Sequence, residues 1–178
     1  MNKLSVMLFT FSALLYSCGG ESNKNVTAEN AATVPEQPQT RWEYSDKTNE
    51  MDDSKTYFAA IEANEELQFD FPYSGGTNVY LTLRKGKDLD VILSISQGQF
   101  LPNIMGDRYI KVRFDDKPAE NYSYSDPSDY STTAVFINSE TKFLKNLKSA
   151  KKMIIQCEFY NEGTQTIKFD TDGLIWEH

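Results

Sequence analysis

The sequence contains very few of the side chains on which metal binding and nucleophilic catalysis most often depend. It has one histidine, His178, and two cysteines, Cys18 and Cys157. A single imidazole excludes a histidine-based metal cluster and a Ser-His or Cys-His catalytic pair of the usual kind. The spacings G-x-x-x-x-G-K-[ST] and G-x-G-x-x-G are absent too, so no phosphate-binding loop is predicted. We therefore expect no metal site, no cofactor and no catalytic residue.

The sequence also lacks an excess of positive charge. It has 18 Lys and Arg residues against 26 Asp and Glu residues, a formal net charge of −8 at pH 7. Because the phosphate backbone of a nucleic acid attracts basic surfaces, binding to nucleic acid is not expected. An acidic balance of this kind mainly favours solubility.

Carboxylates are plentiful, and a catalytic pair among them is the one enzymatic alternative that remains open. The best pairs in the sequence are Asp115 with Asp116 and Asp170 with Asp172. A glycosidase-like hydrolase would need two such groups in one cleft, about 5 Å or about 6.5–9.5 Å apart.

No apolar run in the sequence is long enough for a membrane-spanning helix, which needs roughly 20 residues. The run from Leu4 to Leu15 follows the basic residue Lys3. It fits the apolar region of a secretory signal peptide.

The stretch LLYSCGG, residues 14–20, places the small residue Ser17 directly before Cys18. This arrangement resembles the lipobox of bacterial lipoproteins, in which the signal is cut before a diacylated cysteine. The resemblance implies a signal peptide over residues 1–17 and lipidation of Cys18, since two or more acyl chains anchor a protein stably on a bilayer. The alternative is an ordinary signal peptide, or a short N-terminal anchor, with an incidental cysteine. Gly19 stands where an Asp often retains lipoproteins at the inner membrane, which favours the outer membrane.

Residues 18–41 are predicted to form the lipidated cysteine and a disordered tether. The segment is rich in Gly, Ser, Asn, Thr, Ala, Gln and Pro and poor in large apolar residues. Such a segment buries too little apolar surface to offset the entropy lost on ordering.

Residues 42–178 are predicted to form a single, mainly β domain. In VYLTLRK, residues 79–85, the apolar residues Val79, Leu81 and Leu83 occupy every second position. The same period of two occurs in LQFDF, DVILSIS, YIKVRFDD, MIIQCEFY and TIKF. Such segments, separated by turn residues, predict an antiparallel β-sandwich or open barrel. On this pattern Cys157 lies on a buried face, and it has no disulfide partner once Cys18 is lipidated.

One segment departs from the period of two. In NSETKFLKNLKSAKK, Phe143 and Leu147 recur at helical spacing, which predicts one amphipathic helix near residues 140–152 with Ser139 or Asn138 as N-cap. Lysines that include Lys145 and Lys148 cover its outer side. That side is either a solvated face or a contact for an anionic partner.

Aromatic residues make up 13% of the chain, and ten of them are tyrosines. The stretch YSYSDPSDY, residues 122–130, concentrates Tyr122, Tyr124 and Tyr130 among Ser and Asp. Exposed tyrosine provides contact area at low entropic cost, so the three form a candidate partner-binding surface. The alternative is an edge strand whose tyrosine rings lie on neighbouring side chains.

The folded region carries several landmarks in a fixed order: Trp42, FDFPYSGG, LTLRKG, VILSISQGQF, VRFDD, AVFI, FLKNLKSAKKMIIQCEFYNEG and FDTDGLIW. This order resembles the TagO/VasI-like accessory proteins associated with type VI secretion and, more distantly, the invasion-associated locus B proteins. The family has a cysteine where this chain has Lys85. The resemblance implies a non-enzymatic envelope protein and carries over no catalytic residues.

Together these features predict a lipid-anchored protein of the cell envelope that acts as a binding or accessory module. Its expected contacts are the membrane, through acyl chains, and an envelope protein or glycan. A structural accessory of a secretion system and a carboxylate-based envelope hydrolase are the alternatives. The oligomeric state and the face of the membrane are left open.

Overall fold

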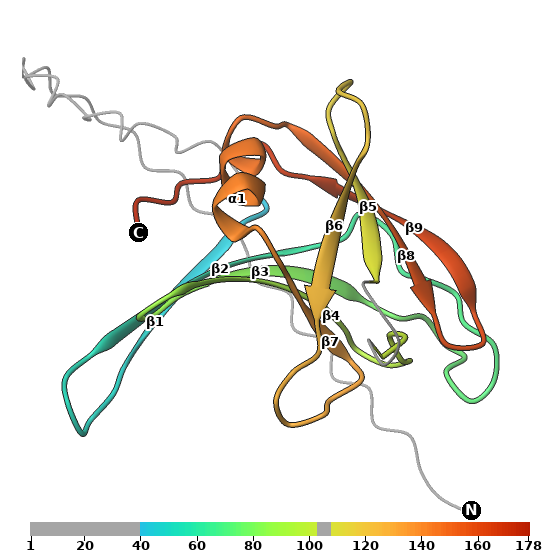
Figure 1. The fold of residues 1–178 in the computed structure, drawn as a ribbon, viewed down its shortest axis with the longest axis horizontal. Helices are drawn as coiled ribbons and strands as arrows, with labels where there is room; N and C mark the ends of the chain where they lie inside the picture. The colour runs from blue at the N-terminus through green and yellow to red at the C-terminus, as the bar shows by residue number, and fades with distance from the viewer. Residues whose placement is uncertain (1–39, 103–107) are drawn as a thin grey trace, which may run out of the picture. The chain divides into compact units, whose positions relative to one another are not determined.

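The structure, a computed structural model, describes residues 40–102 and 108–178 (Figure 1). The predicted signal peptide, Cys18 and the tether up to residue 39 lie outside the described residues. The described part contains nine strands and one helix: β1 (Glu43–Thr48), β2 (Lys55–Glu62), β3 (Val79–Lys85), β4 (Leu89–Ile95), β5 (Tyr109–Phe114), β6 (Glu120–Ser125), β7 (Ala134–Ile137), α1 (Glu140–Lys148), β8 (Lys152–Phe159) and β9 (Gly163–Asp170). No helix within these ranges is long and apolar enough to cross a membrane.

The nine described strands form one antiparallel sheet in the order β1-β2-β3-β4-β7-β6-β5-β8-β9. β1 and β9 are its two edges, so the sheet is open and does not close into a barrel. The prediction of a mainly β, antiparallel fold is confirmed.

The sheet turns its apolar face inward around one core. Figure 1 shows β5, β6, β8 and β9 passing across β2, β3 and β4, so that two halves of the same sheet face each other. Phe159 of β8 packs against Phe69 and Phe100, with ring centroids 5.2 and 4.9 Å apart. Because Phe69 and Phe100 follow β2 and β4 in the chain, these rings join both halves of the sheet in one hydrophobic cluster.

The helix α1 closes another part of this core. Its two buried residues are Phe143 and Leu147, and Phe143 meets Phe114 and Tyr122 edge-to-face at 5.3 Å each. The helix is shorter than the predicted range, because the chain turns at Ser149 and continues into β8. Ser139 does precede the helix, but its backbone is left-handed (φ 63°) and its side chain caps no N–H group. A side-chain cap requires an extended backbone at that residue.

The segment LQFDF, residues 67–71, was predicted as a strand, and this prediction is wrong. Leu67 and Phe69 are buried, as the alternation indicates, but the segment belongs to the long β2–β3 connection. Its only ladder contact among the described residues is an isolated bridge in which Leu67 and Thr77 exchange two backbone hydrogen bonds of 2.9 and 2.8 Å. The apolar residues of a loop folded back on itself can alternate in the same way as those of a strand.

The segment after β9 packs back across the start of the fold. The indole Nε1 of Trp42 donates to the carbonyl of Thr171 at 3.0 Å, and the Ile175 N–H donates to the hydroxyl of Tyr44 at 2.8 Å. The His178 ring stacks on Tyr57, with centroids 3.7 Å apart and planes 8° from parallel. These contacts fix residues 171–178 against β1 and β2.

Removing the Phe143 side chain should destabilise the domain strongly. This ring is fully buried and contacts two other aromatic rings, so Phe143→Ala should lower the free energy of unfolding by about 3–5 kcal/mol. Urea denaturation followed by tryptophan fluorescence measures the change. Lys145→Ala, on the exposed side of the same helix, should stay within about 0.5 kcal/mol of wild type. Equal losses in both variants would show that α1 is not packed as described.

Candidate functional site

Four loops meet at one end of the sheet: residues 63–78, 96–102, 126–133 and 160–162, here called the loop end (Figure 1). Hydrogen bonds from backbone N–H groups join them to one another. The Tyr160 N–H donates to the Gln99 carbonyl at 2.9 Å, and the Phe100 N–H donates to the Thr132 carbonyl at 2.8 Å. The Asp70 N–H donates to the Glu162 carboxylate at 3.2 Å. The loop end is therefore a connected surface built from four separate parts of the chain.

The loop end exposes large aromatic side chains. Phe71 is 90% exposed and Tyr130 is 88% exposed, and about half of Tyr160 is also accessible. Carboxylates stand next to these rings in the chain, at Asp70 and Asp129. Because such rings provide apolar contact area while their neighbours accept hydrogen bonds, the surface suits recognition of a protein or a glycan.

Local hydrogen bonds hold Tyr130 in place. Its N–H donates to the Pro127 carbonyl at 3.0 Å, and the Ser131 N–H donates to the Asp129 carboxylate at 3.0 Å. The Tyr130 backbone is left-handed, with φ of 60°, a conformation that is unfavourable for a bulky residue. A strained conformation maintained at an exposed aromatic residue suggests a function for that residue.

Two glutamines of the neighbouring loop form hydrogen bonds with the loop that carries Phe71. Nε2 of Gln97 donates to the carbonyls of Tyr73 at 3.0 Å and Gly76 at 2.6 Å. Nε2 of Gln99 donates to the Tyr73 hydroxyl at 2.9 Å. A surface that is ordered before binding loses less conformational entropy when a partner arrives.

A small hollow lies beside Tyr130. Its volume is about 120 Å³, and it is lined by Phe100, Pro102, Asp126, Tyr130, Ser131, Thr132, Ala134 and Val135. This is room for one side chain or a small chemical group, and the hollow is less than the usual size of a small-molecule site.

Two of the three predicted surface tyrosines are in the core. Tyr122 and Tyr124 lie on β6 and are 2% and 3% exposed. The Tyr122 hydroxyl accepts from Asn146 at 3.1 Å, and the Tyr124 hydroxyl donates to the Leu101 carbonyl at 3.0 Å. Burial raises the pKa of Tyr122, and it raises the pKa of Tyr124 to about 12. The prediction that these two form an exposed surface is wrong, because β6 is an interior strand paired with β5 and β7. Of the three, only Tyr130 is exposed.

The predicted lysine face is exposed as expected. Lys145 and Lys148 lie in the last turn of α1, and neither forms an ion pair within the described ranges. Lys142 differs from them, since its ammonium lies 2.6 Å from the Glu120 carboxylate, and this hydrogen bond raises the pKa of Lys142. Cations are favourable at a helix C-terminus, so Lys148 also has a structural role. Binding of an anionic partner by Lys145 and Lys148 stays a prediction.

The predicted carboxylate pairs have structural partners. Oδ1 of Asp115 accepts the N–H groups of Lys151 and Lys152, both at 2.9 Å. Asp116 pairs with Arg113 at 3.4 Å, while Asp170 and Asp172 lie 4.0 and 3.9 Å from Arg41 and Lys151. Among the residues that the structure describes, no group of three or more His, Cys, Asp or Glu side chains is arranged to hold a metal ion.

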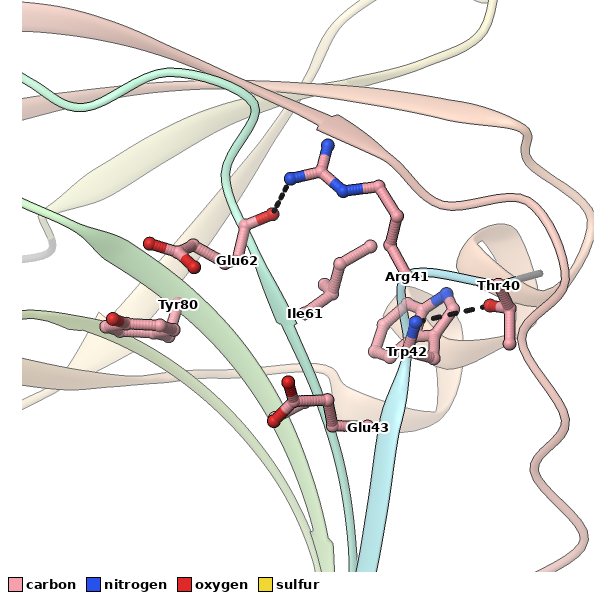
Figure 2. A pocket seen from close by; sticks show the side chains of 8 residues that line it. Thr40, Arg41, Trp42, Glu43, Ile61, Glu62 and Tyr80 are labelled. Atoms are coloured by element: carbon pink, nitrogen blue, oxygen red, sulfur yellow. Dashed lines mark hydrogen bonds between the residues drawn. The ribbon is translucent and has the colours of Figure 1, made fainter. Parts of the chain in front are cut away.

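Another hollow lies elsewhere, on the outer face of the sheet near the start of β1 (Figure 2). Its volume is about 330 Å³, and Glu43, Glu62 and Tyr80 point along one side of it. On the other side the Arg41 guanidinium donates to the carbonyls of Glu62 and Ala63, both at 3.3 Å. Because those bonds tie the chain entering β1 to the end of β2, we assign Arg41 a structural role. The charged side chains that line this hollow are therefore of both signs, with Arg41 beside Glu43 and Glu62.

Comparison of the chain with protein-family models, with curated proteins and with solved structures finds no match in any of the three. The interpretation of the surfaces therefore depends on their own geometry and chemistry.

Cys157 should be chemically inert in the folded protein. The residue is 2% exposed, and burial raises the pKa of its thiol to about 12, so almost no thiolate forms near neutral pH. In a Cys18→Ala background, where Cys157 is the single thiol, a disulfide reagent at pH 8 should react only after guanidinium is added. Rapid reaction of the native protein would contradict this burial.

Proposed function

We propose that this chain is a lipid-anchored protein of the bacterial cell envelope that binds an envelope protein or glycan through its loop end and catalyses no reaction. The observation that carries the proposal is the pair of almost fully exposed rings, Phe71 and Tyr130, on a surface that is ordered by its own hydrogen bonds. Exposed aromatic side chains that are already held in position are typical of binding surfaces.

The anchor is proposed from the lipobox-like stretch LLYSCGG and its Cys18. The acyl chains on Cys18 would hold the domain at a membrane, and Gly19 favours the outer one. The predicted tether of residues 18–41 is shorter at its end, because Thr40 and Arg41 are hydrogen-bonded to the domain. The segment from Cys18 to residue 39 would then let the loop end reach partners a short distance from the bilayer.

The non-catalytic part of the proposal has two supports. The sequence carries a single histidine, and the carboxylates of its best acidic pairs bind backbone N–H groups or basic side chains. The resemblance of its sequence landmarks to TagO/VasI-like accessory proteins also favours a non-enzymatic protein. A role as an accessory of a secretion system is one form that this binding function would take.

Replacement of the lipidated cysteine should release the protein from membranes. Cys18→Ala removes the only predicted attachment point, so the variant should move from the membrane pellet to the soluble fraction after the cells are disrupted and centrifuged. Cys157→Ser is the matched control, since its thiol is buried in the domain, and it should remain in the pellet. If Cys18→Ala stays membrane-bound, the lipid anchor is refuted.

Capture of a partner should depend on the loop end. The full-length protein, solubilised in detergent, is used as bait against envelope extract, and the captured material is analysed for proteins and glycans. Phe71→Ala and Tyr130→Asn should each reduce capture by about tenfold, the size of effect expected when an aromatic side chain that contacts a partner is truncated. Asn tolerates the left-handed backbone of position 130, so folding should be preserved.

Met51→Ala is the control for exposure alone. Met51 is 91% exposed but lies in the turn between β1 and β2, which is not one of the four loops of the loop end, and its loss should leave capture unchanged. If capture depends on Lys145 and Lys148 and not on the aromatic residues, the loop end is the wrong surface. Cleavage of a captured glycan would contradict the non-catalytic part of the proposal.

A further inference from the structure

Within the described residues, no strand pairs with the outer side of the edge strand β1, although residues 171–178 contact its Tyr44 side chain. All six of its side chains are exposed, its pairing with β2 is regular from Glu43 to Thr48, and it contains no proline. Figure 1 shows the β1–β2 hairpin projecting beyond the rest of the sheet. Natural proteins usually protect such an edge, because its free backbone groups can pair with another strand.

The unused backbone groups of β1 can be assigned from the hairpin. The Asn49 N–H donates to the Ser54 carbonyl at 2.8 Å, and hydrogen-bonded pairs alternate along an antiparallel ladder. Residues 43, 45 and 47 therefore direct their backbone groups to β2, and Tyr44, Asp46 and Thr48 direct theirs outward. No backbone hydrogen bond reaches these outward groups from elsewhere in residues 40–102 and 108–178.

The opposite edge of the sheet is different. The β2–β3 connection covers part of β9, where the Asn64 N–H donates to the Lys168 carbonyl at 2.8 Å and the Asp170 N–H donates to the Asn64 side chain at 3.1 Å. The sheet therefore covers part of the β9 edge with its own chain, whereas β1 has no such cover and carries charged side chains along its edge.

The charges along β1 are complementary to those of a second copy in one register. If two β1 strands pair antiparallel about Ser45, Glu43 lies opposite Lys47 of the second copy, and Tyr44 lies opposite Asp46. Neither Glu43 nor Lys47 has an ion pair within the described part of its own chain, whereas Asp46 lies 3.9 Å from Lys55. Pairing about Asp46 or about Lys47 would instead place like charges directly opposite each other, which is unfavourable.

We infer that two copies of this chain associate through β1, antiparallel and centred on Ser45, to form one continuous sheet. Tyr44 and Asp46 of the two copies then exchange four backbone hydrogen bonds, and two Glu43–Lys47 pairs flank them. The contact is isologous, so it closes on itself as a dimer and does not extend into a filament. It leaves the loop end free and is independent of the partner proposed above.

Cysteine crosslinking of the full-length protein in its membrane tests both the contact and its register. At the two-fold axis Ser45 would face its own copy as a non-hydrogen-bonded pair, with Cα atoms about 4.5 Å apart. This is within the range that a disulfide spans, so Ser45→Cys should form covalent dimers under mild oxidation. The matched control is Lys47→Cys, whose two copies would be about 13 Å apart along the strands and should not crosslink. Cys157 is buried and should not react. The wild-type protein, treated in the same way, is the control for any crosslink through Cys18.

A charge exchange provides the second measurement. In the Ser45→Cys background, Lys47→Glu would place Glu opposite Glu twice and should lower the dimer yield by about tenfold or more. Adding Glu43→Lys would restore opposite charges in the same register and should restore the yield. Both positions are exposed, so the folding of the monomer should change little.

Three results would overturn the inference. The first is the absence of a Ser45→Cys dimer, or equal crosslinking of Ser45→Cys and Lys47→Cys. The second is crosslinking of Asp46→Cys in place of Ser45→Cys, which would show another register. The third is a crosslink from Ser45→Cys to a different protein, which would mean that the edge of β1 receives a strand from another partner.

Discussion

The contact of Phe159 with Phe69 and Phe100 is the interaction on which the arrangement of this domain depends. A single antiparallel sheet with one apolar face must cover that face, and a nine-stranded sheet can do so by folding over itself. The three rings meet where the two halves of the sheet come together. Phe143 contributes the same kind of cover from α1, against Phe114 and Tyr122. Strand pairing alone would leave the apolar face of the sheet exposed, and these aromatic contacts bury it.

This closure also determines where the candidate binding surface lies. When β8 crosses the first half of the sheet, its turn at residues 160–162 comes to rest beside the loops at residues 63–78 and 96–102. Loops distant in sequence are thereby brought to one end and joined by hydrogen bonds. The exposed rings of Phe71 and Tyr130 lie on loops that hydrogen bonds hold in place, which would lower the entropic cost of binding a partner there. The edge of β1 is a separate surface with its own backbone chemistry.

Several elements could be predicted from the sequence because their patterns are local. The alternation in VYLTLRK matches β3 residue for residue, and the same pattern located β4, β5, β8 and β9. β1 could not be found in this way, because all of its side chains are exposed and no alternation exists. The alternation of LQFDF predicted a strand that does not form, because a folded loop buries Leu67 and Phe69 in the same alternating pattern. Of the candidate site, Tyr130 was found as an exposed residue, and Phe71 was missed because it sat inside that mistaken strand.

The sequence by itself determined the class of the fold and much of its core, since period-two burial follows from the geometry of an extended backbone. It also determined that Cys157 is a buried thiol, because this residue shares a strand face with Met153, Ile155 and Phe159. Only the tertiary structure decided which strands became neighbours. The strand order in turn decided whether each tyrosine is buried or exposed. Tyr122 and Tyr124 are core residues because β6 lies between β5 and β7, and Tyr130 is a surface residue because it follows in the loop. Strand order arises from pairing between distant segments, and a local pattern carries no information about it.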